Sequence, residues 1–242
     1  MKNLHVGTSG WSYKEWKPDF YPADLPQRRW LEHYCNSLGA CEINATFYRL
    51  QSLETFAKWS EASPPGFRFT TKAHRRLTHW GGWELGERYR SFQDTYFKSV
   101  TALGGRLGVV LWQFPPYKQR DEGGLGGLLE ALPRDLSHAF EFRHESWEAD
   151  EIGTFVAERG GTVCVSNTDG TVPAALPPGP LAYVRLRTER YSAEARSGWL
   201  DLLHREAETR PVYLFVKHEG IPAADEFGGI GLARWLSARS HE

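Results

Sequence analysis

The chain has 242 residues, of which 40% are hydrophobic, and a formal net charge of -1 at pH 7. Such a length and balance suit one globular α/β domain and argue against a protein that coats polyanions generally. Cys35, Cys41 and Cys164 are odd in number and form no CxxC pair, which indicates neither a disulfide framework nor a zinc ribbon. Without an apolar signal core or a membrane-length apolar run, we expect a soluble cytoplasmic protein that binds no membrane.

The first half of the chain alternates short strand patterns with helical patterns. Apolar spacing predicts helices after Pro26, from Ser52 as the cap to Glu61, and from Tyr89 to Leu103. The intervening segments have the alternation or the continuous apolar character of strands. These predicted strands cover residues 4–8, 40–44, 67–73 and 107–113.

The second half continues the same alternation. Helical spacing follows at 125–132, 152–156, 199–203 and 232–236. Residues 167–180 contain four prolines, so we predict no full helix there. The predicted strands are Phe140-Glu141-Phe142-Arg143, 163–166, 181–187 and 212–216.

Eight strands separated mostly by helices predict a closed parallel barrel of the (β/α)8 type. We expect it to form a single domain over residues 1–242, with the helix after the sixth strand short or missing. In such barrels the functional residues lie at the carboxyl ends of the strands.

Polar residues gather at these predicted strand ends and do not recur at the strand starts. Because side chains alternate along a strand, we expect five of these residues to converge on one mouth of the barrel. The five are Glu42, Lys72, Glu141, Arg143 and Arg185.

Three local patterns have two readings each. Glu141 and Arg143 share a strand face, either as part of a site or as an ion pair that only fixes strand register. Gly7-Thr8-Ser9-Gly10 either makes a tight turn or brings the backbone close to an anion. The aromatic segment 78–83 is typical of a binding loop or of a packed surface loop.

Several short motifs are spread over the chain: Gly7-Thr8-Ser9-Gly10-Trp11, Glu42-Ile43-Asn44-Ala45-Thr46-Phe47-Tyr48, Lys72, Thr78-His79, Gln113-Phe114-Pro115-Pro116, Glu141-Phe142-Arg143, Asp169 and Tyr183-Val184-Arg185-Leu186. Together these motifs resemble those of the YecE-like family, a domain of unknown function. The resemblance covers nearly the whole chain and implies a TIM-type barrel. The chain departs from the family pattern at Arg187, and at Val216-Lys217-His218.

The candidate site combines carboxylates with cations. Paired carboxylates can act as acid and base, and Lys72 can form a Schiff base or stabilise charge. We predict catalytic roles for four residues: Glu42, Lys72, Glu141 and Asp169. We predict substrate-binding roles for Asn44, His74, His79, Gln113, Arg143, Arg185, Arg187, Tyr191 and Lys217.

A metal is not favoured, because the available ligands follow no local metal-binding spacing. Those ligands are His74, His79, Glu42, Glu141 and Asp169, and the cofactor stays open.

Two classes of function fit these residues. The first is an enzyme, a hydrolase or lyase, that acts on a small phosphate- or carboxylate-bearing substrate by carboxylate acid–base chemistry. The alternative is a non-catalytic protein that binds an anion or nucleic acid. In both, we expect Lys72, Arg143 and Arg185 to capture the anion together.

Overall fold

The computed structural model describes residues 3–80, 83, 85–217 and 220–239. Its strands form one parallel sheet in the order β6-β5-β4-β3-β2-β1-β9-β8-β7. β6 and β7 are separated only by Cys164, so they are two parts of the single strand that the sequence predicts there. The strands are β1 (Leu4–Thr8), β2 (Ala40–Ile43), β3 (Arg68–Lys72), β4 (Leu107–Gln113), β5 (His138–Glu141), β6 (Gly161–Val163), β7 (Val165–Asn167), β8 (Ala182–Leu186) and β9 (Val212–Val216).

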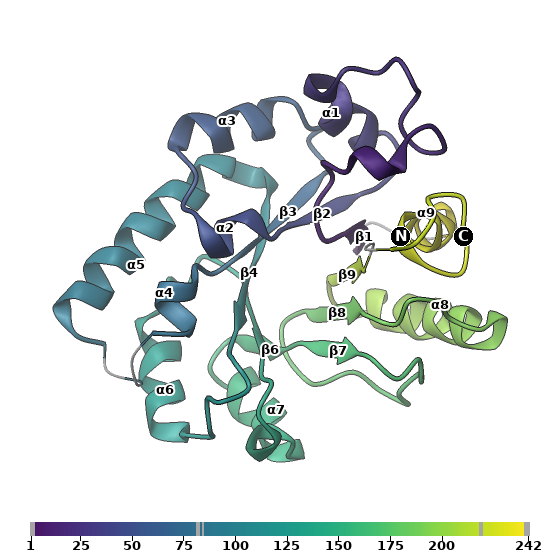
Figure 1. The fold of residues 1–242 in the computed structure, drawn as a ribbon. Helices are drawn as coiled ribbons and strands as arrows, with labels where there is room; N and C mark the ends of the chain where they lie inside the picture. Colours follow the sequence, from purple (N-terminus) through teal and green to yellow (C-terminus); the bar gives the residue numbers. More distant parts are fainter. Residues whose placement is uncertain (1–2, 81–82, 84, 218–219, 240–242) are drawn as a thin grey trace.

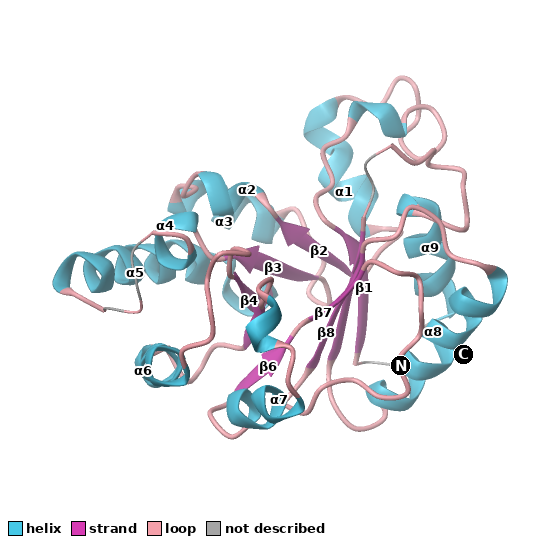
Figure 2. Cartoon of the chain, turned by 60° about the horizontal axis from the view of Figure 1, so that its bottom comes forward, coloured by secondary structure: helices cyan, strands magenta, loops and turns pink. Residues whose placement is uncertain are grey.

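Helices surround these strands on the outside (Figures 1 and 2). Ser52, Asp121 and Ser192 each accept a backbone hydrogen bond at the start of a helix, which explains where α3, α6 and α8 begin. The helices are η1 (Lys14–Trp16), η2 (Gln27–Arg29), α1 (Trp30–Cys35), α2 (Ala45–Tyr48), α3 (Leu53–Glu61), α4 (Arg75–Thr78), α5 (Glu87–Val100), η3 (Thr101–Arg106), α6 (Glu122–Ala131), η4 (Glu145–Trp147), α7 (Asp150–Ala157), α8 (Ala193–Ala207) and α9 (Gly229–Arg239).

The strands bury both of their faces, as expected for a barrel. On β4, Val110 and Trp112 belong to the large core beneath the helices, whereas Val109 and Leu111 belong to a separate core inside the barrel. This inner core also contains Tyr183 of β8. The α/β barrel and its single-domain organisation, both predicted from the sequence, are confirmed.

The connection between β7 and β8 contains no helix in residues 168–181, all of which the structure describes. The prolines of this segment remove backbone donors and clash with helical turns, which explains the missing helix. The strand at Glu141 begins and ends two residues earlier than predicted: β5 covers His138–Glu141, so Phe142 and Arg143 lie beyond it.

The glycines near β1 serve close packing. A Cβ on Gly7 would lie 1.9 Å from the carbonyl oxygen of Ala40, and Gly10 has a φ of 107°. The backbone N–H groups of Thr8, Ser9 and Gly10 all donate within the protein. They are therefore not free to cradle an anion, and the tight-turn reading is the better one.

None of the helices in the described part of the chain combines the length and apolar character that a bilayer crossing requires.

Candidate functional site

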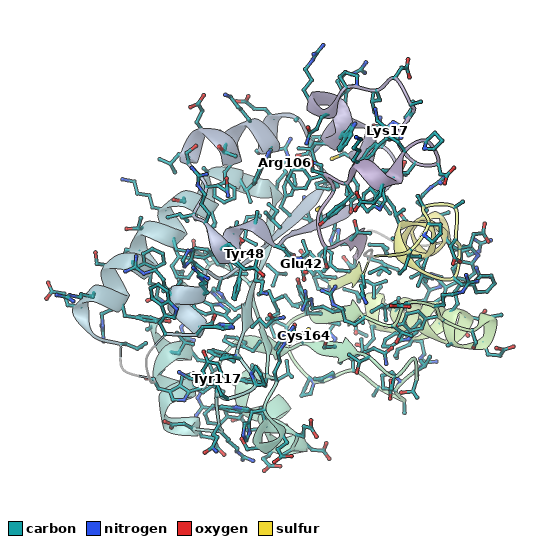
Figure 3. The ribbon with its side chains drawn as sticks, in the orientation of Figure 1. Lys17, Glu42, Tyr48, Arg106, Tyr117 and Cys164 are labelled. Carbon is teal, nitrogen blue, oxygen red and sulfur yellow. The ribbon has the colours of Figure 1, made fainter. Side chains whose placement is uncertain are left out.

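Polar side chains from five strands meet at the carboxyl-terminal mouth of the barrel. Glu42 lies near the centre of the molecule in the view of Figure 3. Because all the strand pairs are parallel, their carboxyl ends open on the same side. We call this set the mouth cluster: Glu42, Lys72, Gln113, Glu141, Arg143, Arg185 and Arg187.

Glu42 is the most heavily bonded member and is fully buried. Its Oε1 accepts hydrogen bonds from Ser9 Oγ at 2.8 Å, Arg185 Nη2 at 2.8 Å and Arg187 Nη2 at 3.3 Å. Its Oε2 accepts from Tyr183 OH at 2.8 Å and Arg185 Nε at 3.0 Å. Arg185 therefore donates to this carboxylate from two nitrogens, and such a bidentate pair is the strongest geometry for an arginine and a carboxylate.

Arg185 also reaches the second carboxylate. Its Nη1 donates to Glu141 Oε2 at 2.6 Å, while Glu141 Oε1 accepts from Gln113 Nε2 at 2.9 Å and Arg143 Nε at 3.0 Å. One buried guanidinium therefore joins β2, β5 and β8 across the barrel interior. This arrangement has the character of a structural frame for the mouth.

The cations of this frame control the protonation of both glutamates. Burial alone would raise the pKa of Glu42, but Arg185 and Arg187 outweigh it and lower the pKa to about 2. The pKa of Glu141 is lowered in the same way by Arg185 and Arg143, against the effect of burial. Both carboxylates are therefore ionised at neutral pH.

This lowered pKa predicts an acid-labile fold. The stability that Glu42 contributes is present above its unfolded pKa of 4.5 and is lost as pH falls toward 2. We expect the free energy of unfolding to decline by about 3 kcal/mol over this interval from Glu42 alone. In Glu42→Gln, which is less stable at pH 7, the decline should be shallower. Urea denaturation between pH 7 and pH 2.5 measures this, and equal pH dependence in both proteins would contradict the assignment.

Arg143 and Arg187 differ in how much of the guanidinium is accessible to a ligand. Arg187 is largely buried and donates to Ser9 and Glu42. Within the described part of the chain, Arg143 donates a side-chain hydrogen bond only through its Nε, and 48% of its side-chain surface is exposed. Arg143 therefore presents part of its guanidinium outward, where it can bind a ligand.

Lys72 is only 8% exposed and forms no direct ion pair among the described residues, although Glu42 and Glu141 act on it electrostatically from farther away. Thr46 fixes its backbone, with the Thr46 hydroxyl 3.0 Å from Lys72 N and 2.7 Å from Lys72 O. The Lys72 ammonium lies 3.9 Å from the centre of the Phe47 ring. Burial and the nearby Arg185 lower the pKa of Lys72 to about 8.

His79 lies beside this lysine. Its ring packs edge-on against Phe47, with centroids 4.9 Å apart, and its Nδ1 bonds Thr78 Oγ1 at 2.8 Å. Burial lowers the pKa of His79, and Lys72 and Arg143 lower it further. The imidazole is therefore neutral at pH 7.

Other predicted site residues are engaged in local structure. His74 caps α4 by accepting from Arg76 N at 3.1 Å. Asp169 accepts from Asn167 and Thr171 in the loop after β7, and Tyr191 donates to Asn167 Oδ1 at 2.8 Å. These three side chains stabilise a turn, a cap or a loop and do not join the mouth cluster.

Two further predicted residues lie at strand ends. Lys217 follows β9, and its ammonium forms a long ion pair with Glu189, at 3.9 Å. Asn44 follows β2, and its buried Oδ1 has no hydrogen-bond partner among the described residues. His218, Gly81 and Gly82 lie outside the described residues.

The sequence did not assign Ser9, Tyr183 and Phe47, which all contact the cluster. Tyr183 shares the face of Arg185 on its strand, so alternation alone could have placed it beneath the site. Phe47 belongs to a quoted family motif, but its position over Lys72 depends on how α2 packs on β3. No group of three His, Cys, Asp or Glu side chains suited to a metal occurs within the described ranges.

A groove with a volume of about 880 Å³ lies elsewhere on the molecule. It is lined by α9, the start of β1 and the segment after α1, and it contains no member of the mouth cluster. We therefore place the candidate site by its charged groups rather than by cavity size.

Comparisons with known proteins agree with this architecture. UPF0759 protein YunF of Bacillus subtilis is 27% identical over 149 residues, which are 60% of this chain and 52% of that protein. The matched segment therefore spans about half the length of this curated relative. A DUF72 family protein of Thermotoga maritima has a TM-score of 0.77 and 24% identity, with 99% of each chain covered.

A D-psicose 3-epimerase crystallised in the presence of D-fructose has a TM-score of 0.55 and 13% identity, covering 96% of this chain and 89% of that one. At this identity the likeness shows the barrel fold alone. The family described as "Protein of unknown function DUF72" matches residues 5–227. The chain, with its parallel barrel and its charged mouth, therefore belongs to the DUF72 family.

Proposed function

We propose that the mouth cluster is the active site of an enzyme, a lyase or hydrolase, that acts on a small phosphate- or carboxylate-bearing substrate. The observation that carries this proposal is Lys72, a buried ammonium without a carboxylate partner among the described residues. Burying an unpaired cation is costly, so such a group at the functional end of a barrel favours a role in binding or chemistry.

The charge balance of the cluster supports an anionic ligand. Its two carboxylates are outnumbered by three arginines and Lys72. Arg185 is already committed through Nε, Nη1 and Nη2, so the proposal gives anion capture to Lys72 and Arg143. This revises the expectation that Arg185 takes part in capture.

Proton transfer in this proposal belongs to Lys72. With a pKa of about 8, Lys72 has both charged and neutral forms accessible near neutral pH. Glu42 and Glu141 stay ionised, and their oxygens are occupied by donors from the protein. Their role is to hold Arg185 and to set the field around Lys72, in place of the acid–base role that the sequence suggested.

The test is a substrate search with a matched variant. Wild type and Lys72→Met are incubated with a defined mixture of phosphorylated and carboxylated metabolites, and depletion is followed by mass spectrometry. We expect wild type to consume at least one compound, and Lys72→Met to be slower by about 100-fold or more. Lys58→Met, at an exposed surface position, is the control.

If wild type binds phosphate but consumes nothing, the proposal fails in favour of the alternative, a non-catalytic anion-binding protein. The paired state of Glu42 and Glu141 is the observation that favours this alternative.

Arg143→Ala should weaken the binding of phosphate or sulfate by about 1.5–3 kcal/mol, the value of a hydrogen bond to a charged group. The fold should persist because the Arg143 side chain is half exposed. Calorimetry of wild type and variant measures the effect, with the exposed Arg29→Ala as control. Unchanged affinity in Arg143→Ala would leave the ion pair with Glu141 as the only role of Arg143.

A further inference from the structure

We infer that the substrate is a nucleotide, free or at the end of a strand, whose base stacks on aromatic rings at the rim of the mouth. This inference rests on the proposed function and names its substrate class. The rings are Phe47, Tyr48, His79 and Tyr117, which we call the aromatic arc.

The first observation is where the exposed apolar side chains lie. Among the described residues, the exposed large hydrophobic side chains are Tyr48, Leu53, Trp80 and Tyr117. All four belong to segments that follow the carboxyl ends of β2, β3 or β4. Single exposed apolar residues are ordinary, but their restriction to the functional end of the barrel is typical of a binding surface.

The second observation is that the rings of the aromatic arc contact one another in an unbroken series. Tyr48 contacts Phe47, Phe47 contacts His79, and His79 contacts Tyr117, with centroid distances of 4.9, 4.9 and 6.4 Å. Tyr117 OH also donates to His79 O at 3.0 Å. Tyr48 and Tyr117, each 66% exposed, are labelled to the left of Glu42 in Figure 3. The arc thus offers exposed ring surface at both ends.

The third observation joins the arc to the anion site. The ammonium of Lys72 lies 3.9 Å from the centre of the Phe47 ring, in the middle of the arc. Lys72, Arg143, Arg75 and Lys118 all act electrostatically on His79. Aromatic faces among cations are the combination that binds a base together with its phosphate. The inference assigns the phosphate to Lys72 and Arg143 and the base to the ring surface of His79 and Tyr117, which continues from Phe47.

Calorimetry with three probes tests this inference: adenosine 5′-monophosphate (AMP), ribose 5-phosphate and inorganic phosphate. We expect AMP to bind more tightly than the two probes that lack a base. Tyr117→Ala should weaken AMP binding by about 5- to 100-fold and leave phosphate binding unchanged. Tyr117→Phe keeps the ring and should keep the affinity. Leu53→Ala is the matched control, an exposed residue on the same face outside the arc.

A short 5′-phosphorylated oligothymidylate distinguishes the two sources of the nucleotide. If the ligand is the end of a strand, the oligothymidylate should bind more tightly than AMP, and Tyr48→Ala should weaken its binding. If the ligand is a free nucleotide, the oligothymidylate should bind no more tightly than AMP. If AMP binds no better than ribose 5-phosphate, or if Tyr117→Ala leaves AMP binding unchanged, the inference of a nucleotide substrate is wrong. Phosphate binding and substrate turnover that persist in that case would leave the proposed function standing.

Discussion

Replacing Arg185 with Met should reduce the free energy of unfolding at pH 7 by about 3–5 kcal/mol, the usual result of breaking a buried ion pair from one side. The variant leaves Glu42 and Glu141 buried without their shared partner. Arg187 and Arg143 remain, but each contacts only one of the two carboxylates. Urea denaturation at pH 7 measures the loss.

Arg143→Ala is the control for this experiment, since a half-exposed ion pair contributes about 1 kcal/mol or less. Adding Glu42→Gln and Glu141→Gln to Arg185→Met should recover part of the lost stability, because the uncompensated charges are then gone. A loss below about 1 kcal/mol in Arg185→Met would contradict the role of Arg185 as the centre of the frame.

Replacing Lys72 with Met should make the protein more stable while it removes the proposed activity. At pH 7 the lowered pKa of Lys72, about 8 against 10.5, corresponds to a cost of about 3 kcal/mol for holding its charge in the fold. Methionine keeps the apolar contact with Phe47 without that cost. Such an exchange of stability for function is common at active sites.

The pH dependence of this effect has a defined sign. Between pH 8 and pH 10.5 the unfolded chain keeps the Lys72 proton and the folded chain releases it, so wild-type stability rises with pH in this interval. The gain in free energy of unfolding of Lys72→Met over wild type should therefore be greatest at pH 7 and disappear by pH 10.5. Urea midpoints at several pH values measure it, with exposed Lys58→Met as control. A destabilised Lys72→Met protein at pH 7 would show that the ammonium is not held at a cost.

The fold was largely predictable from local pattern. The bounds of β4 and β9 match the apolar segments 107–113 and 212–216, because a strand buried on both faces must be apolar over its length. Alternation along the strands likewise identified the side of the barrel on which Glu42, Lys72 and Arg185 meet. The structure adds which of these side chains bond to one another.

The pairing inside the mouth could not be predicted, because alternation gives a face and not a partner. From sequence, Lys72, Arg143 and Arg185 were expected to capture an anion together. In the structure Arg185 is neutralised by Glu42, which lies 143 residues earlier in the chain. Only the geometry of barrel closure brings these two positions together. Among the described residues, it leaves Lys72 as the cation of the cluster that forms no direct ion pair.

Local hydrogen bonding explains the predicted residues that lie apart from the cluster. Asp169 precedes Gly170, and its carboxylate accepts from Thr171, the pattern of a turn closed by its own side chain. His74 caps a helix in the same local manner. Both residues follow strand ends, so strand position alone could not separate them from the site.

The central claim is that Lys72 binds the anion and transfers the proton, and a titration of its amine by NMR tests this most directly. Lysine is labelled with ¹³C at Cε, and the Lys72 signal is assigned by its absence in Lys72→Met. The account predicts a pKa of about 8 in the free protein, and a higher pKa when inorganic phosphate binds beside the ammonium. A pKa above 10 that does not change with phosphate would contradict it.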